Sequence, residues 1–91
     1  MINKEKHLVS QELWDEMLKV GWVKETILGR AIASEILEEL PYKINEHYLT
    51  IGKDVEYYCN VHYGSKILVT GIGLPNALAK MWLYLHKESI Q

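Results

Sequence analysis

The segment of residues 42–70, YKINEHYLTIGKDVEYYCNVHYGSKILVT, decides the fold class. β-Branched and aromatic residues recur along it with a period of two, which is typical of β-strands. Turn residues at Gly52-Lys53-Asp54 and at Gly64-Ser65 divide the segment into three runs. Because short turns join neighbouring strands in antiparallel fashion, the segment predicts a three-stranded antiparallel meander.

The two turns also predict a register. A three-residue first loop and a two-residue second turn give the pairs Tyr48–Tyr58, Leu49–Tyr57, Ile51–Val55, Val61–Leu68 and His62–Ile67. One face of the sheet is then apolar enough to lie against helices and contains Leu49, Ile51, Val55, Tyr57, Cys59, Val61 and Leu68. We expect this face to form the main core.

The second face is expected to be nearly as apolar. It contains Ile44, Tyr48, Tyr58, His62, Ile67 and Val69, with Thr50, Glu56 and Asn60 as its plainly polar members. Because a solvated face should alternate to polar residues, we expect this face to be covered. Two alternatives could provide this cover. One is the first helix, through Trp14, Met17 and Leu18, and the other is a second subunit across a two-fold axis. The intrachain cover is favoured, since three helices suffice for both layers.

Three helices flank the strands. The first is predicted between the N-cap Ser10 and Gly21, which suits a helix C-terminus. The second is predicted from the N-cap Thr26 to Pro41, which cannot continue a helix. The third begins near Pro75 and is apolar beyond one stripe. We therefore predict a single α+β domain over residues 1–91, with the element order α-α-β-β-β-α and the sheet sandwiched by helices.

Composition narrows the class of protein. The 91 residues are 48% hydrophobic and 24% charged, as in soluble globular proteins, and the formal net charge is -2. This charge provides no positive field for a phosphate backbone, so nucleic acid is not expected as a partner. The one cysteine, Cys59, cannot form an internal disulfide, which favours a reducing cytoplasm. The most hydrophobic stretch, residues 67–85, is interrupted by glycine, proline and lysine, so we expect no membrane association.

Cysteine and histidine chemistry is not favoured. Cys59 and His62 are three residues apart on a strand, so they point to opposite faces and we predict no metal site. His47 lies opposite Cys59 in the proposed register, but no third residue is evident that would orient such a nucleophilic pair. We therefore predict no catalytic residues and a protein that is not an enzyme.

Two other patterns are better explained by structure than by chemistry. Gly71-x-Gly73 lies between a strand and a helix like a phosphate-binding loop, but Pro75 removes an amide donor and Asn76 replaces the third glycine. The carboxylates at positions 35, 38 and 39 lie on the polar edge of a predicted amphipathic helix. No cofactor is expected.

The aromatic residues of the second face are the candidate binding residues. Tyr48 and Tyr58 are predicted as a cross-strand pair with His62 nearby, and rings with a polar tip suit a binding surface. The alternative is that these side chains simply pack under a helix.

The C-terminal segment carries a family resemblance. Residues 74–88, LPNALAKMWLYLHKE, resemble the closing helix of small phage and prophage proteins, in which an Ala-Leu-Ala-Lys-Leu-Trp-like run follows a proline. Residues 40–44 and 48–51 also resemble the helix end and first strand of such proteins. The chain is thus similar to the phage ABA sandwich domain group over about residues 35–88. The resemblance implies a mobile-element origin, a bacterial host cytoplasm and helix/sheet/helix layering, and it carries over no catalytic residues.

The leading hypothesis is a non-enzymatic interaction protein of phage or prophage origin that binds a host or phage protein. The alternative is an oligomeric protein that binds or sequesters a small, nucleotide-like ligand in a pocket between subunits. Both hypotheses are compatible with a homo-oligomer.

Overall fold

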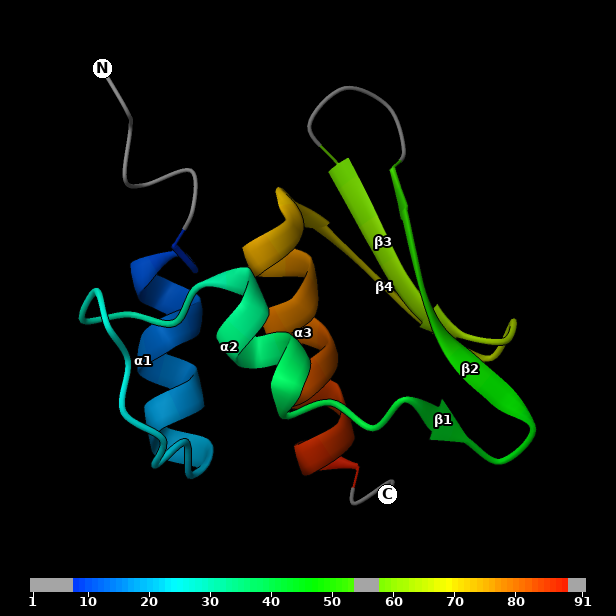
Figure 1. Ribbon diagram of the computed structural model, residues 1–91, viewed down its shortest axis with the longest axis horizontal. Coiled ribbons are helices and arrows are strands. Elements are labelled where there is room, and N and C mark those ends of the chain that lie inside the picture. The colour runs from blue at the N-terminus through cyan, green and yellow to red at the C-terminus, as the bar shows by residue number, and fades with distance from the viewer. Residues whose placement is uncertain (1–7, 54–57, 89–91) are drawn as a thin grey trace.

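The computed structural model describes residues 8–53 and 58–88, which form an α+β fold (Figure 1). The helices are α1 (Gln11–Val20), α2 (Ala33–Glu38) and α3 (Leu74–Lys87), and the strands are β1 (Lys43–Ile44), β2 (His47–Lys53), β3 (Tyr58–Tyr63) and β4 (Ile67–Ile72). The strands form one antiparallel sheet in the order β1-β2-β3-β4. The α+β class is as predicted, whereas the described sheet has four strands instead of three.

The first helix is as predicted, because both of its ends are fixed locally. The Ser10 side chain accepts a hydrogen bond from the Leu13 amide, and Gly21 ends the helix with a φ of 131°. Trp14 and Met17 occupy the buried side of α1.

The second helix is much shorter than the predicted run from Thr26, and the prediction of its start is wrong. Gly29 has a φ of 85°, which no helix accommodates, and Ile32 is extended and forms an isolated bridge with Leu8. The helix begins only after Ile32, whose amide donates to the Glu35 side chain at 2.9 Å. Ile27 is consequently exposed.

The additional strand β1 arises from a turn that the sequence pattern did not reveal. Asn45 has a φ of 55°, a conformation that asparagine tolerates better than most residues, and the chain reverses there. Lys43 therefore pairs with Tyr48, and Ile44 with His47. Ile44 is buried and does not belong to the open face of the sheet, so its predicted place is wrong.

The register between β2 and β3 also differs from the prediction. Ile51 pairs with Val61 and Leu49 with Tyr63, so the connection between these strands is longer than three residues. Neither Leu49–Tyr57 nor Ile51–Val55 is a pair. The predicted positions of Val55, Glu56 and Tyr57 lie outside the described residues.

Between β3 and β4 the turn has three residues instead of two. Tyr63 pairs with Ile67 and Val61 with Val69, one residue away from the predicted register. Since neighbouring side chains on a strand point to opposite faces, this slip exchanges the two faces of β4. Ile67 and Val69 therefore pack against the core, whereas Leu68 is exposed.

The helices all lie on one side of the sheet, so the predicted sandwich is wrong (Figure 1). Helix α3 is central: it packs on β3 and β4, and α1 and α2 pack on α3. This position explains why α3 is apolar on more than one stripe. Its buried residues are Pro75, Ala77, Leu78, Ala79, Met81, Trp82, Leu83 and Leu85. Helix α1, through Trp14 and Met17, covers α3, so none of the described helices covers the second face of the sheet.

Tyr63 ties the sheet to the connection between α2 and β1. Its ring is buried on the helix side of β3, and its hydroxyl donates a hydrogen bond to the carbonyl oxygen of Pro41 at 2.5 Å. Burial raises the pKa of the Tyr63 phenol to about 12.

This pKa predicts a loss of stability at high pH. The unfolded phenol releases its proton near pH 10, whereas the folded one holds it until about pH 12, so the free energy of unfolding falls between these values. Tyr63→Phe should flatten this decline and should cost about 1 kcal/mol at neutral pH through the lost hydrogen bond. Urea unfolding of both proteins from pH 9 to 12 measures the difference. Equal slopes would show that Tyr63 does not contribute to the decline.

Candidate functional site

The face of the sheet that points away from the helices is the candidate site, and we call it the outer sheet face. Its described side chains follow from the strand register and are Lys43 of β1, Tyr48 and Thr50 of β2, Tyr58, Asn60 and His62 of β3, and Leu68, Thr70 and Ile72 of β4. Among these nine residues, Lys43 is the one that carries a full charge at neutral pH. The large members are open to solvent: Tyr58 is 47% exposed, and Leu68 and Ile72 are 58% and 59% exposed.

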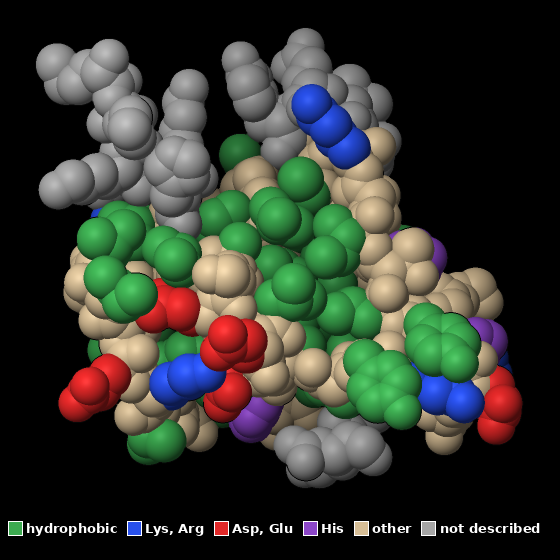
Figure 2. Space-filling view, viewed as in Figure 1, with side chains coloured by type: hydrophobic (Ala, Val, Ile, Leu, Met, Phe, Trp, Pro, Cys, Tyr) green, Lys and Arg blue, Asp and Glu red, His purple; other side chains and the backbone are tan. Residues whose placement is uncertain are grey.

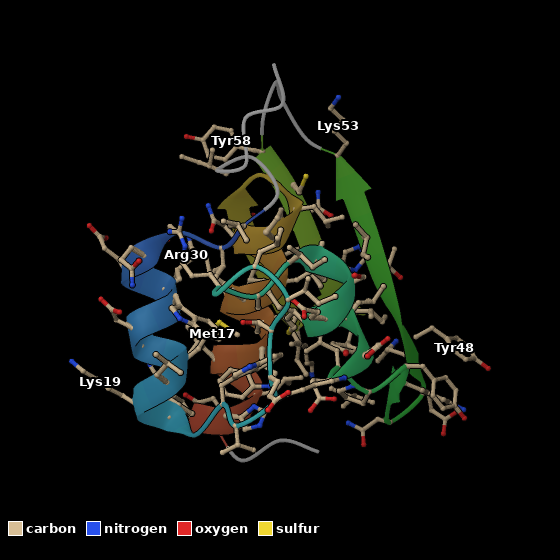
Figure 3. All side chains as sticks on the ribbon, turned by 60° about the vertical axis from the view of Figure 1, so that its left-hand side comes forward. Met17, Lys19, Arg30, Tyr48, Lys53 and Tyr58 are labelled. Atoms are coloured by element: carbon tan, nitrogen blue, oxygen red, sulfur yellow. The ribbon has the colours of Figure 1, made fainter. Side chains whose placement is uncertain are left out.

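The three residues singled out from the sequence share this face but do not form one cluster. Tyr48 lies near the β1 end of the sheet and Tyr58 near the opposite end (Figure 3). The predicted Tyr48–Tyr58 pair is therefore wrong, because Tyr58 pairs with Ile72 and Tyr48 with Lys43. His62 lies between them and pairs with Thr50 on β2 and Leu68 on β4.

A small aromatic corner surrounds Tyr48. The rings of Tyr42 and Tyr48 lie 6.3 Å apart, and Lys43 Nζ lies 5.4 Å from the centroid of the Tyr48 ring. Both tyrosines are largely exposed. Sequence reasoning missed Tyr42, because only the turn at Asn45 brings it back beside Tyr48.

The second corner of the outer sheet face is aliphatic and aromatic. Tyr58 and Ile72 face each other across β3 and β4, and Leu68 lies on the same face further along β4. His62 is held by its own turn, since its Nδ1 lies 3.1 Å from the Gly64 carbonyl oxygen. This contact places the proton of a neutral ring on Nδ1 and leaves Nε2 as an acceptor.

The predicted approach of Cys59 and His47 does not occur. Cys59 pairs with Lys53, and His47 instead packs over Gly64, where an added Cβ would lie 2.7 Å from the imidazole ring. Cys59 and His62 lie on opposite faces, as their spacing predicts. Within the parts of the chain that the structure describes, no group of three His, Cys, Asp or Glu residues could hold a metal ion.

The helix carboxylates have structural partners. Glu35 accepts hydrogen bonds from the amides of Ile27 and Ile32, at 3.2 and 2.9 Å. Lys24 Nζ lies 2.6 Å from Glu38, which lowers the pKa of the Glu38 carboxyl and raises the pKa of Lys24, mainly through their hydrogen bond. Because this pair is exposed to solvent, it contributes little to stability.

The role of Gly71 is to let helix α3 approach strand β4 closely, rather than to bind phosphate. A Cβ at this position would lie 2.6 Å from the Ala77 backbone nitrogen and 2.8 Å from the Ala77 Cα. Helix α3 therefore sits directly on the backbone of β4, and only glycine permits this distance.

A pocket of about 560 Å³ lies where the loop after α1 meets the last turns of α3. Its lining includes Trp22, Lys24, Glu38, Glu39, Trp82 and His86. The rings of Trp82 and His86 stack at 3.9 Å, and Trp22 meets Trp82 edge-on at 5.4 Å. Sequence reasoning missed this pocket, because its residues come from three segments that only the tertiary structure brings together.

Each described helix is too short or too polar to cross a membrane. Comparison of the chain with protein families, with curated proteins and with solved structures finds no match.

Proposed function

We propose that the chain is a non-enzymatic interaction protein that binds another protein through the outer sheet face. The observation that carries this proposal is the position of the described helices, which all lie on one side of the sheet and leave Tyr58, Leu68 and Ile72 exposed on the other. An exposed apolar patch of several hundred Å² is about the largest that a monomer usually carries, and such patches are often binding sites.

The composition of the outer sheet face favours a protein partner. Aromatic and aliphatic side chains with few charges are typical of the central part of protein interfaces. The nine described residues of this face include a single cation, Lys43, whereas a phosphate backbone would require several. In line with the resemblance to phage proteins, we propose a host or phage protein as the partner and the bacterial cytoplasm as the location.

A pair of matched variants tests this surface. Leu68→Asp places a charge on the outer sheet face, and Leu18→Asp places the same charge on α1, where Leu18 is similarly exposed. Purified wild-type protein and both folded variants are used as bait in lysate of the bacterial host. We expect a partner that is captured by the wild-type protein and by Leu18→Asp, but lost with Leu68→Asp. Equal capture by both variants, or no capture by any folded bait, would contradict the proposal.

Stability measurements check that the outer sheet face is open. Tyr58→Ala should cost less than about 1 kcal/mol, because the side chain is half exposed, whereas Tyr63→Ala on the buried side of the same strand should cost about 3–5 kcal/mol. Thermal unfolding of the two variants gives the comparison. Similar losses would mean that Tyr58 is covered after all.

The pocket beside Trp82 supports a second candidate, the binding of a small nucleotide-like ligand. Its volume lies within the roughly 300–1,000 Å³ range of ligand pockets. The exposed ring of His86, which stacks on the buried Trp82, suits a planar base. Lys24 suits a phosphate when it exchanges its hydrogen bond to Glu38 for the ligand. A nucleotide at about 100 times its dissociation constant should stabilise the fold by roughly 2.7 kcal/mol in a thermal-shift assay, and Lys24→Ala should reduce this effect. The absence of a shift with any common nucleotide would exclude this candidate.

A further inference from the structure

Strand β2 has an edge that is paired over only part of its length. Its first two residues, His47 and Tyr48, pair with β1, and the Leu49 amide donates to the Tyr42 carbonyl oxygen at 2.9 Å. Beyond that contact, no strand within residues 8–53 or 58–88 pairs with this side of β2. The paired part of this edge therefore ends with β1, and the open part extends from there to Lys53.

The backbone groups along this edge can be assigned from the ladder pattern. In an antiparallel pair, the amide and carbonyl of one residue point to the partner strand and those of the next point away. Since the Leu49 amide points away from β3, those of Ile51 and Lys53 do the same. Ile51 and Lys53 thus present a strand's hydrogen-bonding groups on the open side of β2.

Apolar side chains adjoin this edge on the helix side of the sheet, and we call them the β2 edge surface. Helix α3 contacts the sheet mainly through β3 and β4, and α2 packs on α3, so the helix side of β2 is less covered than that of β3 and β4. Leu37 of α2 is 39% exposed and Ile51 of β2 is 42% exposed. Figure 2 shows a continuous hydrophobic area near the middle of the molecule, where Figure 1, in the same view, has α2 and β2 on its two sides.

The direction of Leu37 follows from helix geometry. Glu35 points toward the loop before α2, because it accepts hydrogen bonds from the amides of Ile27 and Ile32. Leu37 is two residues further on and thus about 200° around the helix, on the side of the sheet. Ala33, four residues earlier, shares this side. The β2 edge surface therefore contains Ala33 and Leu37 of α2 and Leu49 and Ile51 of β2. Lys53, which pairs with Cys59, adds a positive charge at its end.

We propose that the open edge of β2 binds an extended peptide segment of a partner protein by strand addition. The peptide continues the line of β1, pairs with Ile51 and Lys53, and directs every second side chain, which is apolar, onto the β2 edge surface. The site is separate from the outer sheet face, because the β2 edge surface lies on the helix side of the sheet. The two surfaces can therefore be disabled independently.

The size of the edge favours a peptide over a second copy of the chain. Residues 49–53 span about 17 Å, and a single added strand is about 5 Å wide. This contact is well below the roughly 800 Å² per partner that a stable dimer buries. A short segment, by contrast, needs no more than the strand edge and the apolar residues of the β2 edge surface.

The test uses a capped seven-residue peptide, Lys-Val-Thr-Val-Thr-Val-Lys, titrated into the full chain by calorimetry. Ile51→Pro removes the outward amide without removing a hydrogen bond to β3, so the fold should persist, and Ile51→Val keeps the amide and most of the apolar surface. We expect Ile51→Pro to weaken binding by about tenfold or more, and Ile51→Val to weaken it less than threefold. Leu68→Asp on the outer sheet face should leave peptide affinity unchanged.

Modified peptides keep the test decisive if Ile51→Pro does not fold. One peptide carries N-methyl groups on its valine amides and a second carries them on its threonine amides; only one of these sets faces β2 in a given strand direction. We expect one methylated peptide to bind and the other to fail. Equal binding of both, or no binding of the unmodified peptide, would overturn the proposal. A wild-type dimer that Ile51→Pro converts to a monomer would overturn it in favour of a second copy.

Discussion

Trp82→Ala should remove about 3–5 kcal/mol from the free energy of unfolding, which is a large part of the roughly 5–14 kcal/mol expected for a chain of this length. Trp82 is buried on α3, stacks on His86 and meets the ring of Trp22, which in turn meets Trp14 at 6.0 Å. These rings connect the central helix to α1 and to the loop that follows it. Truncation therefore opens a cavity at the contact between layers.

Denaturant unfolding followed by circular dichroism measures this loss. The matched control is Tyr48→Ala, an aromatic truncation on the outer sheet face, which should cost less than about 1 kcal/mol because the ring is mostly exposed. Comparable midpoints for the two variants would mean that the tryptophan cluster does not hold the helical layers together.

Gly71→Ala should be almost as damaging, with a cost of about 3 kcal/mol, although it adds a single methyl group. The added Cβ would lie 2.6 Å from the Ala77 nitrogen and 2.8 Å from the Ala77 Cα, both backbone atoms of α3. Because a backbone cannot swing aside like a side chain, α3 must move off β4, and the packing on both sides of the helix suffers.

Gly52→Ala is the matched control for this prediction. A Cβ at Gly52 would also lie 2.6 Å from its nearest neighbour, but that atom is the side-chain oxygen of Asn60, which can rotate away. We expect a cost below about 1 kcal/mol, measured by the same unfolding experiment. If Gly71→Ala is tolerated equally well, α3 does not lie as close to β4 as described.

The elements that the sequence predicted correctly are those with local causes. Helix α1 is bounded by the cap of Ser10 and by Gly21, and α3 begins at the proline turn near Pro75. The run of β-branched and aromatic residues between positions 42 and 70 predicted an antiparallel sheet, and the described residues form one. Such signals act within one or two turns of chain, so no tertiary contact is needed to interpret them.

The candidate site was only partly predictable. Tyr48, Tyr58 and His62 share the outer sheet face because the predicted and observed registers of β2 and β3 differ by an even number of residues, which preserves the faces. Their separation was not predictable, since it depends on the length of the connection between the two strands. The open edge of β2 depends in the same way on where β1 ends.

The sequence by itself determined the α+β class, the ends of α1 and the start of α3, because caps and periodicity act locally. Only the tertiary structure decided which side of the sheet the helices cover and which residues of β4 face them. The three-residue turn before Ile67 moved the β3–β4 register by one position, and that slip exposed Leu68 while it buried Val69 in part. Pairing and layering depend on contacts between residues far apart in the chain, and here many such arrangements share the same hydrophobic pattern.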